Sequence, residues 1–238
     1  MAAKKPKKKQ SIRNSEYYNT QECFDQLYQD SLHRKRFTQL MDIVTSEENI
    51  MLAYRSIKKN KGSKTKGTNN STIVQMGEKA PNELISYVRK RLQNFHPHAI
   101  RRVEIPKPDG RLRPLGIPTI EDRIIQQCIK QVLEPICEAK FYKHSYGFRP
   151  NRSAHHAIAR AMFLANQSGF HFVVDVDIKG FFDNVNHGKL LKQLWTLGIQ
   201  DKQLLRVLSK MLKAPIAGVG IPEKGVPQGG ILSPLLAN

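Results

Sequence analysis

FVVDVDIKGFFDNVNH, residues 172–187, is the stretch that decides the fold. Residues 172–178 are rich in valine, which is typical of a buried β-strand, yet the run carries two acids. Asp175 and Asp177 would share one face of that strand, about 7 Å apart. Burying an unpaired carboxylate is costly, so either a cation meets these acids or their face is open to water. The opposite, core-facing side would carry Phe172, Val174, Val176 and Ile178.

The composition points to a globular protein with a polyanionic partner. The chain has 238 residues, 39% of them hydrophobic, which is enough for one large domain or two small ones. Its formal net charge of +19 favours nucleic acid as the partner, with an anionic membrane surface as the second choice. No apolar run approaches the ~20 residues that cross a bilayer, and the basic N-terminus lacks the apolar segment of a signal peptide.

The cysteine pattern argues for a reducing compartment. The chain has three cysteines and no CxxC spacing, so neither a disulfide framework nor a zinc site is expected. We therefore expect reduced thiols in a cytoplasmic protein.

Helical periodicity dominates the rest of the chain, so the expected fold class is α+β with more helices than strands. Residues 1–19 are expected to form a disordered basic tail, since five lysines fall within the first nine residues. Ser46 is a good N-cap residue, and Gly198 a good helix terminator. The expected helices span residues 20–45, 46–60, 81–95, 121–136, 153–166, 187–197 and 201–213.

Two basic segments have the composition of nucleic-acid contacts. Residues 58–70 form a loop that is either a flexible linker or a backbone-contacting loop, through Lys61, Lys64 and Lys66. Residues 103–118 read as two extended arms joined at a Pro-Asp-Gly turn. If the arms pair, Lys107 and Arg113 project toward a common anion; the alternative is an exposed basic hairpin.

Two further segments carry polar groups in loops. Residues 145–157 place Arg149 and Arg152 beside Tyr146 and Phe148, which suits stacking on bases. The alternative is an aromatic pair in the core with surface arginines. In GVPQGG, residues 225–230, glycines would let the backbone approach a ligand next to the Gln228 amide.

Together these segments resemble the reverse transcriptases encoded by group II introns, also called maturases. IPKPDGRLRPLGIPTIEDRIIQQ (105–127) and YGFRPNRSAHHAI (146–158) are similar to the two finger motifs of that family. DIKGFFDNVNH (177–187) and GVPQGGILSPLLAN (225–238) are similar to its palm motifs A and B. The resemblance implies an N-terminal extension with the fingers (20–170) and a partial palm (171–238) of a right-hand polymerase. It also implies a bacterial RNA-directed DNA polymerase that adds dNTPs to a primer 3′-hydroxyl.

The resemblance also assigns roles to residues. Asp177 matches the aspartate that ligates two catalytic Mg²⁺ ions, to which Ile178 could add a backbone carbonyl. Lys107 and Arg113 match triphosphate-binding residues, and Gln228 matches the glutamine near the incoming nucleotide.

One aromatic ring is implied in the choice of sugar. Phe182 matches the aromatic that lies under the deoxyribose and excludes a 2′-hydroxyl, although its neighbour Phe181 could be confused with it. For Asp175 we expect a structural role, and for Asp183 a cap on the following turn.

The chain departs from the family pattern in two places. Asn69 and Asn70 stand where the family commonly has an acidic residue. No Asp-Asp pair occurs, so the family's YADD-type motif is missing, and we expect this chain alone to be inactive as a polymerase. The alternatives are a non-catalytic RNA-binding maturase fragment and a retron or diversity-generating reverse transcriptase. The expected partners are intron RNA, an RNA template with a DNA primer, and dNTPs, without a membrane; a homodimer is left open.

Overall fold

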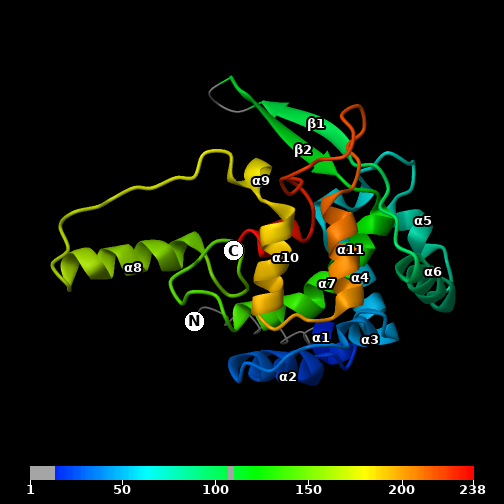
Figure 1. Ribbon diagram of the computed structural model, residues 1–238, viewed down its shortest axis with the longest axis horizontal. Coiled ribbons are helices and arrows are strands. Elements are labelled where there is room, and N and C mark those ends of the chain that lie inside the picture. Colours follow the sequence, from blue (N-terminus) through cyan, green and yellow to red (C-terminus); the bar gives the residue numbers. More distant parts are fainter. Residues whose placement is uncertain (1–13, 107–109) are drawn as a thin grey trace, which may run out of the picture.

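The computed structural model describes residues 14–106 and 110–238, and it confirms a helix-rich α+β fold (Figure 1). Within these residues, no helix is both long and apolar enough to cross a membrane. The helices, with η1 a 3₁₀ turn, are α1 (Asn14–Tyr17), α2 (Gln21–Leu32), α3 (Leu40–Val44), α4 (Glu47–Lys59), η1 (Lys61–Lys64), α5 (Ile73–Gly77), α6 (Pro81–Gln93), α7 (Ile120–Glu138), α8 (Ala154–Asn166), α9 (Phe181–Asn184), α10 (His187–Thr196), α11 (Lys202–Leu212) and α12 (Ser233–Leu236).

Helix α7 is the centre of the core. Thr119 caps its first turn by accepting a hydrogen bond from the backbone N–H of Asp122. Pro135 lies inside the helix, which continues past the expected end at residue 136. Helices α2, α3, α4, α6 and α12 pack against α7, and burying each large apolar side chain contributes about 1.5–3 kcal/mol. Its largest fully buried side chains are Ile120, Ile124, Ile125, Ile129, Leu133 and Ile136.

Most helices lie where periodicity predicts them, and one prediction is wrong. Ser46 caps α4 by accepting a hydrogen bond from the Asn49 N–H, as expected. Residues 20–45 instead form two helices, α2 and α3. The break contains Arg34, whose φ of 58° is incompatible with a continuing α-helix.

Residues 14–17 of the expected disordered tail form α1, and residues 1–13 lie outside the described part. The expected division into fingers and palm near residue 170 stays a prediction. Side chains from both sides, such as Leu27 and Leu208, belong to one hydrophobic cluster.

The predicted hairpin is confirmed as a two-stranded antiparallel sheet of β1 (Arg101–Pro106) and β2 (Leu112–Ile117). Its register pairs Arg101 with Ile117 and Ile105 with Arg113. In Figure 1 it extends from the helical body beside the loop that follows α11.

The predicted strand at 172–178 is wrong. This segment has no regular structure, and it forms part of a long connection that arches from α8 to α9 (Figure 1). Phe172 is 95% exposed and Val174 is 85% exposed, so the apolar residues do not enter a core. A valine-rich run forms a stable strand only where another strand pairs with it, and none of the described strands does.

Candidate functional site

The hairpin and the loop after α11 are held together by two contacts between residues far apart in sequence. The Arg113 Nε donates to Gln228 Oε1 at 2.8 Å, across 115 positions of sequence. The backbone N–H of Gly116 donates to the Gln228 carbonyl at 2.6 Å. Two of the residues expected at the nucleotide therefore touch one another.

Glycine is needed at position 229 for this approach. Gly229 has a φ of +106°, and an added Cβ would lie 2.5 Å from the carbonyl oxygen of Gly116. The sequence predicted a close approach to a ligand, whereas the structure shows a close approach to β2.

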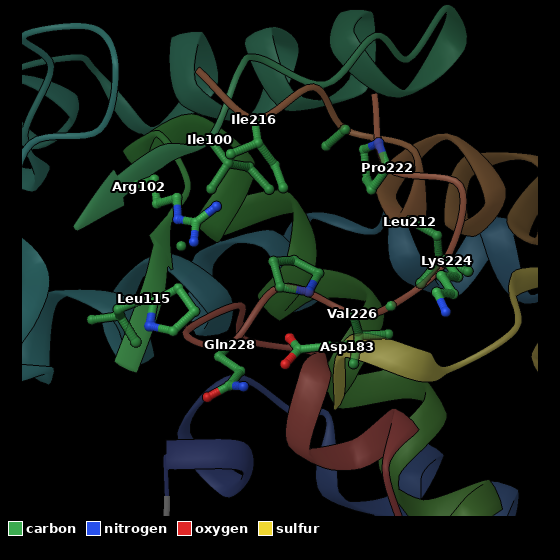
Figure 2. A pocket seen from close by; sticks show the side chains of 15 residues that line it. Ile100, Arg102, Leu115, Asp183, Leu212, Ile216, Pro222, Lys224, Val226 and Gln228 are labelled. Carbon is green, nitrogen blue, oxygen red and sulfur yellow. The ribbon is translucent and has the colours of Figure 1, made fainter. Parts of the chain in front are cut away.

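A pocket of about 180 Å³ opens between the hairpin and this loop (Figure 2). Its walls are mainly apolar, and its charged side chains are those of Arg102, Asp183 and Lys224. Lys224 is oriented by a 2.8 Å hydrogen bond from its Nζ to Asn184 Oδ1. Gln228 also lines the pocket, so its amide is accessible to a bound molecule.

The turn that carries Phe182 is fixed to the same loop. The Val226 N–H donates to the Phe182 carbonyl at 2.8 Å, and the Gly225 N–H donates to the Val185 carbonyl at 2.7 Å. The buried His187 ring contacts the Gly225 carbonyl oxygen at 2.7 Å. The segments resembling palm motifs A and B thus form one unit.

The two phenylalanines of this turn lie in different surroundings. Phe182 is partly buried and packs against the small cluster of Leu190, Leu212 and Val226. Phe181 is more open to solvent, with 38% of its surface exposed. Packing against α10 and α11 keeps Phe182 in place, but it does not test a contact with a sugar.

The expected metal ligands lie on the exposed connection. Asp175 and Asp177 are both exposed, and no group of three His, Cys, Asp or Glu residues within the described part could hold a metal ion. Asp177 and the Ile178 carbonyl can supply at most part of a two-metal site, so the described residues do not complete one. Asp183 is one of the residues that form α9. Lys107 lies outside the described residues.

The basic loop after α4 is held in one conformation by inward-facing groups. Buried Arg123 donates from Nη1 to the Gly62 carbonyl at 2.8 Å and from Nη2 to the Thr65 carbonyl. Arg101 donates to the Lys66 carbonyl at 3.0 Å. The loop is therefore not a free linker. The exposed lysines it carries are Lys61, Lys64 and Lys66.

Sequence comparison identifies the family. Residues 105–238, more than half of the chain, match the family model described as reverse transcriptase (RNA-dependent DNA polymerase). This chain belongs to the reverse transcriptase family.

Relatives of this reverse transcriptase confirm the resemblance to group II intron proteins. The chain is 37% identical over 211 residues to protein YkfC of Escherichia coli, covering 85% of this chain and 55% of YkfC. It is 36% identical over 224 residues to the group II intron-encoded protein LtrA of Lactococcus lactis, covering 92% of this chain and 35% of LtrA. The chain thus spans about half or less of the length of these relatives.

A solved structure is similar as well. The match is to a protein chain of a partial Cas6-RT-Cas1–Cas2 complex, with a TM-score of 0.52 and 26% sequence identity. It covers 83% of this chain and 33% of the chain in that complex.

Arg149 of the reverse transcriptase does not fit its expected role as a nucleic-acid contact. Its side chain is 3% exposed, and its guanidinium donates to both Glu138 oxygens and to the Tyr142 and Ser145 carbonyls. The sequence missed this because Arg149 lies in a loop and its carboxylate partner lies in α7. Arg152 is exposed, with its guanidinium 5.9 Å from the centre of the Tyr146 ring, and its contact with nucleic acid stays a prediction.

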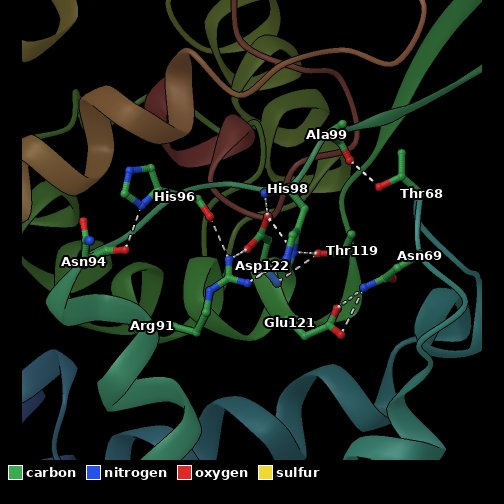
Figure 3. A network of polar contacts seen from close by, with 10 residues as sticks. All are labelled: Thr68, Asn69, Arg91, Asn94, His96, His98, Ala99, Thr119, Glu121 and Asp122. Carbon is green, nitrogen blue, oxygen red and sulfur yellow. Dashed lines mark hydrogen bonds and ion pairs between the residues drawn. The ribbon is translucent and has the colours of Figure 1, made fainter.

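The start of α7 carries a polar network that the sequence reading did not foresee (Figure 3). The Asn69 Nδ2 donates to both oxygens of Glu121 at 3.1 Å. Burial raises the pKa of Glu121, but hydrogen bonds from the backbone and from Asn69 outweigh it and hold that pKa below its ordinary value. The Asn69 amide can therefore donate to the Glu121 carboxylate, whereas an acidic residue at position 69 would repel that carboxylate. Arg91 binds Asp122 at 2.6 Å beside it.

Proposed function

We propose that this chain supplies the fingers and part of the palm of a group II intron reverse transcriptase. The enzyme would add dNTPs to a primer 3′-hydroxyl on an RNA template. The observation that carries the proposal is the contact between Arg113 and Gln228, which joins the first finger segment to the motif B segment at the edge of a pocket. Bacterial relatives and three free cysteines support a bacterial cytoplasm as its setting.

In this proposal the chain's own residues bind and orient the nucleotide. Arg113, together with Lys107, would contact the triphosphate through charge-assisted hydrogen bonds. Gln228, held by Arg113, would present its amide to the incoming nucleotide. Phe182 would lie under the sugar, where a ring fixed by packing leaves little room for a 2′-oxygen.

Reverse transcriptases generally use divalent metal ions. We propose that Asp177 supplies one carboxylate, and Ile178 a carbonyl, to a pair of Mg²⁺ ions, which would stabilise the attacking and leaving oxygens. Further carboxylates are needed to complete such a site, because the described residues hold no acidic cluster.

A chimera tests the proposal, with this chain in place of the matching segment of LtrA, which is 36% identical to it. The chimera should extend a DNA primer on an RNA template. Asp177→Asn should reduce extension at least ~10³-fold, the scale of losing one strong transition-state interaction. The 238-residue chain alone should give no extension. A chimera that extends primers equally well with Asp177→Asn would contradict the assignment.

A second candidate function is RNA binding in intron splicing without polymerisation. The ordered basic loop favours it, since exposed lysines on a fixed backbone suit phosphate contacts in the absence of a complete metal site. Intron RNA would be the partner, and a homodimer stays a prediction. Adding the chain to its intron transcript should speed splicing, and Asp177→Asn should leave that effect unchanged.

A further inference from the structure

A second surface site lies away from the pocket. A groove of about 450 Å³ opens at the C-terminal end of α10, whose N-terminal residue His187 contacts the pocket loop. Helix α10, ten residues or about 15 Å long, lies between the groove and His187. The lining residues are Arg34, Arg36, Lys140, Trp195, Thr196, Leu197, Gly198 and Gln200.

The backbone of the groove is fixed by pairing between two segments. The Phe37 N–H donates to the Gly198 carbonyl, and the Gln200 N–H donates to the Phe37 carbonyl, both at 2.8 Å. Gly198 has a φ of +102°, and an added Cβ would lie 2.7 Å from the Lys35 carbonyl oxygen. The loop after α2 and the turn after α10 therefore hold their side chains in a defined arrangement.

The groove carries positive charge that is not neutralised. Arg34, Arg36 and Lys140 line it, and no acidic residue does. Within the described part of the chain, none of these three side chains forms an ion pair or a hydrogen bond. Lys35 differs, because its Nζ pairs with Asp30 at 2.7 Å. An uncompensated cluster of this kind attracts a polyanion.

Trp195 supplies an aromatic surface beside these cations. It is the single tryptophan of the chain and is 41% exposed. A base stacked on an aromatic ring in a positive groove is the usual arrangement for single-stranded nucleic acids. We infer that this groove binds single-stranded RNA, with Trp195 stacking on a base and Arg34, Arg36 and Lys140 contacting phosphates. The inference goes beyond the proposed polymerase function and does not depend on it.

Tryptophan fluorescence reports on this groove directly, because no other tryptophan contributes. We expect a 12-nucleotide oligouridine to quench the emission of Trp195 saturably. Heparin, a polyanion without bases, should compete for the site but quench little. Binding of the same labelled RNA is followed in parallel by fluorescence anisotropy.

Two variants separate the parts of the site. Trp195→Ala should weaken oligouridine binding by about tenfold, within the range of one lost stacking contact. The triple variant Arg34→Ala, Arg36→Ala, Lys140→Ala should abolish the quenching and reduce the log–log salt slope by about 2. The matched control removes three cations elsewhere: Arg206, Lys210 and Lys213. It should keep the quenching, and circular dichroism should show all variants folded.

Three results would overturn the inference. One is anisotropy that reports RNA binding while Trp195 emission stays unchanged. Another is equal loss of quenching in the triple variant and its matched control. The third is quenching by an acidic peptide, or by anionic phospholipid vesicles, but not by RNA, which would assign the groove to a protein or a membrane.

Discussion

Arg149 and Arg152 are three positions apart and have opposite surroundings. Arg149 is enclosed with Glu138, whereas Arg152 is exposed beside Tyr146. Arg149→Met would leave Glu138 without its partner, so we expect a loss of about 2–3 kcal/mol in the free energy of unfolding. Arg152→Ala should leave stability within about 0.5 kcal/mol but lower the RNA salt slope by about 0.7.

Urea unfolding and RNA titrations at several salt concentrations measure both effects. The folded Arg149→Met protein should bind RNA within about twofold of the parent chain, well under the tenfold that 1.4 kcal/mol represents. A large loss of RNA affinity at unchanged stability would instead mean that Arg149 contacts nucleic acid.

Phe181 and Phe182 offer a second matched pair. Phe182→Val should destabilise the chain by about 1–2 kcal/mol, because it removes packing against Leu190, Leu212 and Val226. Phe181→Val should cost less, since Phe181 is 38% exposed. In the LtrA chimera, Phe182→Val should also raise ribonucleotide incorporation at least ~10-fold, equivalent to about 1.4 kcal/mol of lost discrimination.

The effect on sugar choice is measured as the ratio of ribonucleotide to deoxyribonucleotide incorporation in the Phe181→Val and Phe182→Val chimeras. A shift in sugar choice from Phe181→Val and none from Phe182→Val would place the sugar contact one residue earlier.

At the scale of elements, the basic loop depends on a helix far from it in sequence. Arg123 of α7 binds the Gly62 and Thr65 carbonyls. Arg123→Met should free residues 61–66, so their amides should exchange faster and RNA affinity should fall about three- to tenfold, the cost of ordering the loop on binding. Hydrogen exchange and RNA titration are the measurements.

A double-mutant comparison is the control for this loop. When Lys61, Lys64 and Lys66 are already alanine, Arg123→Met should cause no further loss of affinity, because it acts through those lysines. Fully additive losses would mean that Arg123 affects RNA binding by another route.

The sequence predicts elements whose stability is local and misses those that depend on distant partners. The ranges of α6 and α10 follow from their apolar spacing and end signals, and the hairpin follows from its turn residues. The segment 172–178 has the pattern of a strand, but the pattern cannot say whether a neighbouring strand is present. The break after α2 depends on the pairing of Phe37 with the turn after α10, which no local pattern encodes.

The candidate site divides in the same way. Family resemblance placed Arg113 and Gln228 near one nucleotide, and the structure brings these two side chains into contact. Periodicity could not foresee the Arg149–Glu138 or Asn69–Glu121 pairs, because each joins a loop to a helix. An arginine or asparagine in a loop has the same appearance in sequence whether it binds a ligand or its own protein.

At the scale of the molecule, the net charge of +19 should govern affinity for RNA. Single-stranded binding that neutralises Z phosphates gives a log–log salt slope near −0.7Z, so we expect a slope of about −3 to −6. Residues 1–10 carry five of the lysines, and deleting them should flatten the slope because it removes five positive charges. Fluorescence anisotropy with oligouridine between low and physiological salt measures this. Replacing the same lysines with glutamines, which keeps the length, is the matched control and should flatten the slope equally. A salt-independent affinity would mean that the positive charge only solvates the surface, and RNA would then have to be bound by stacking alone.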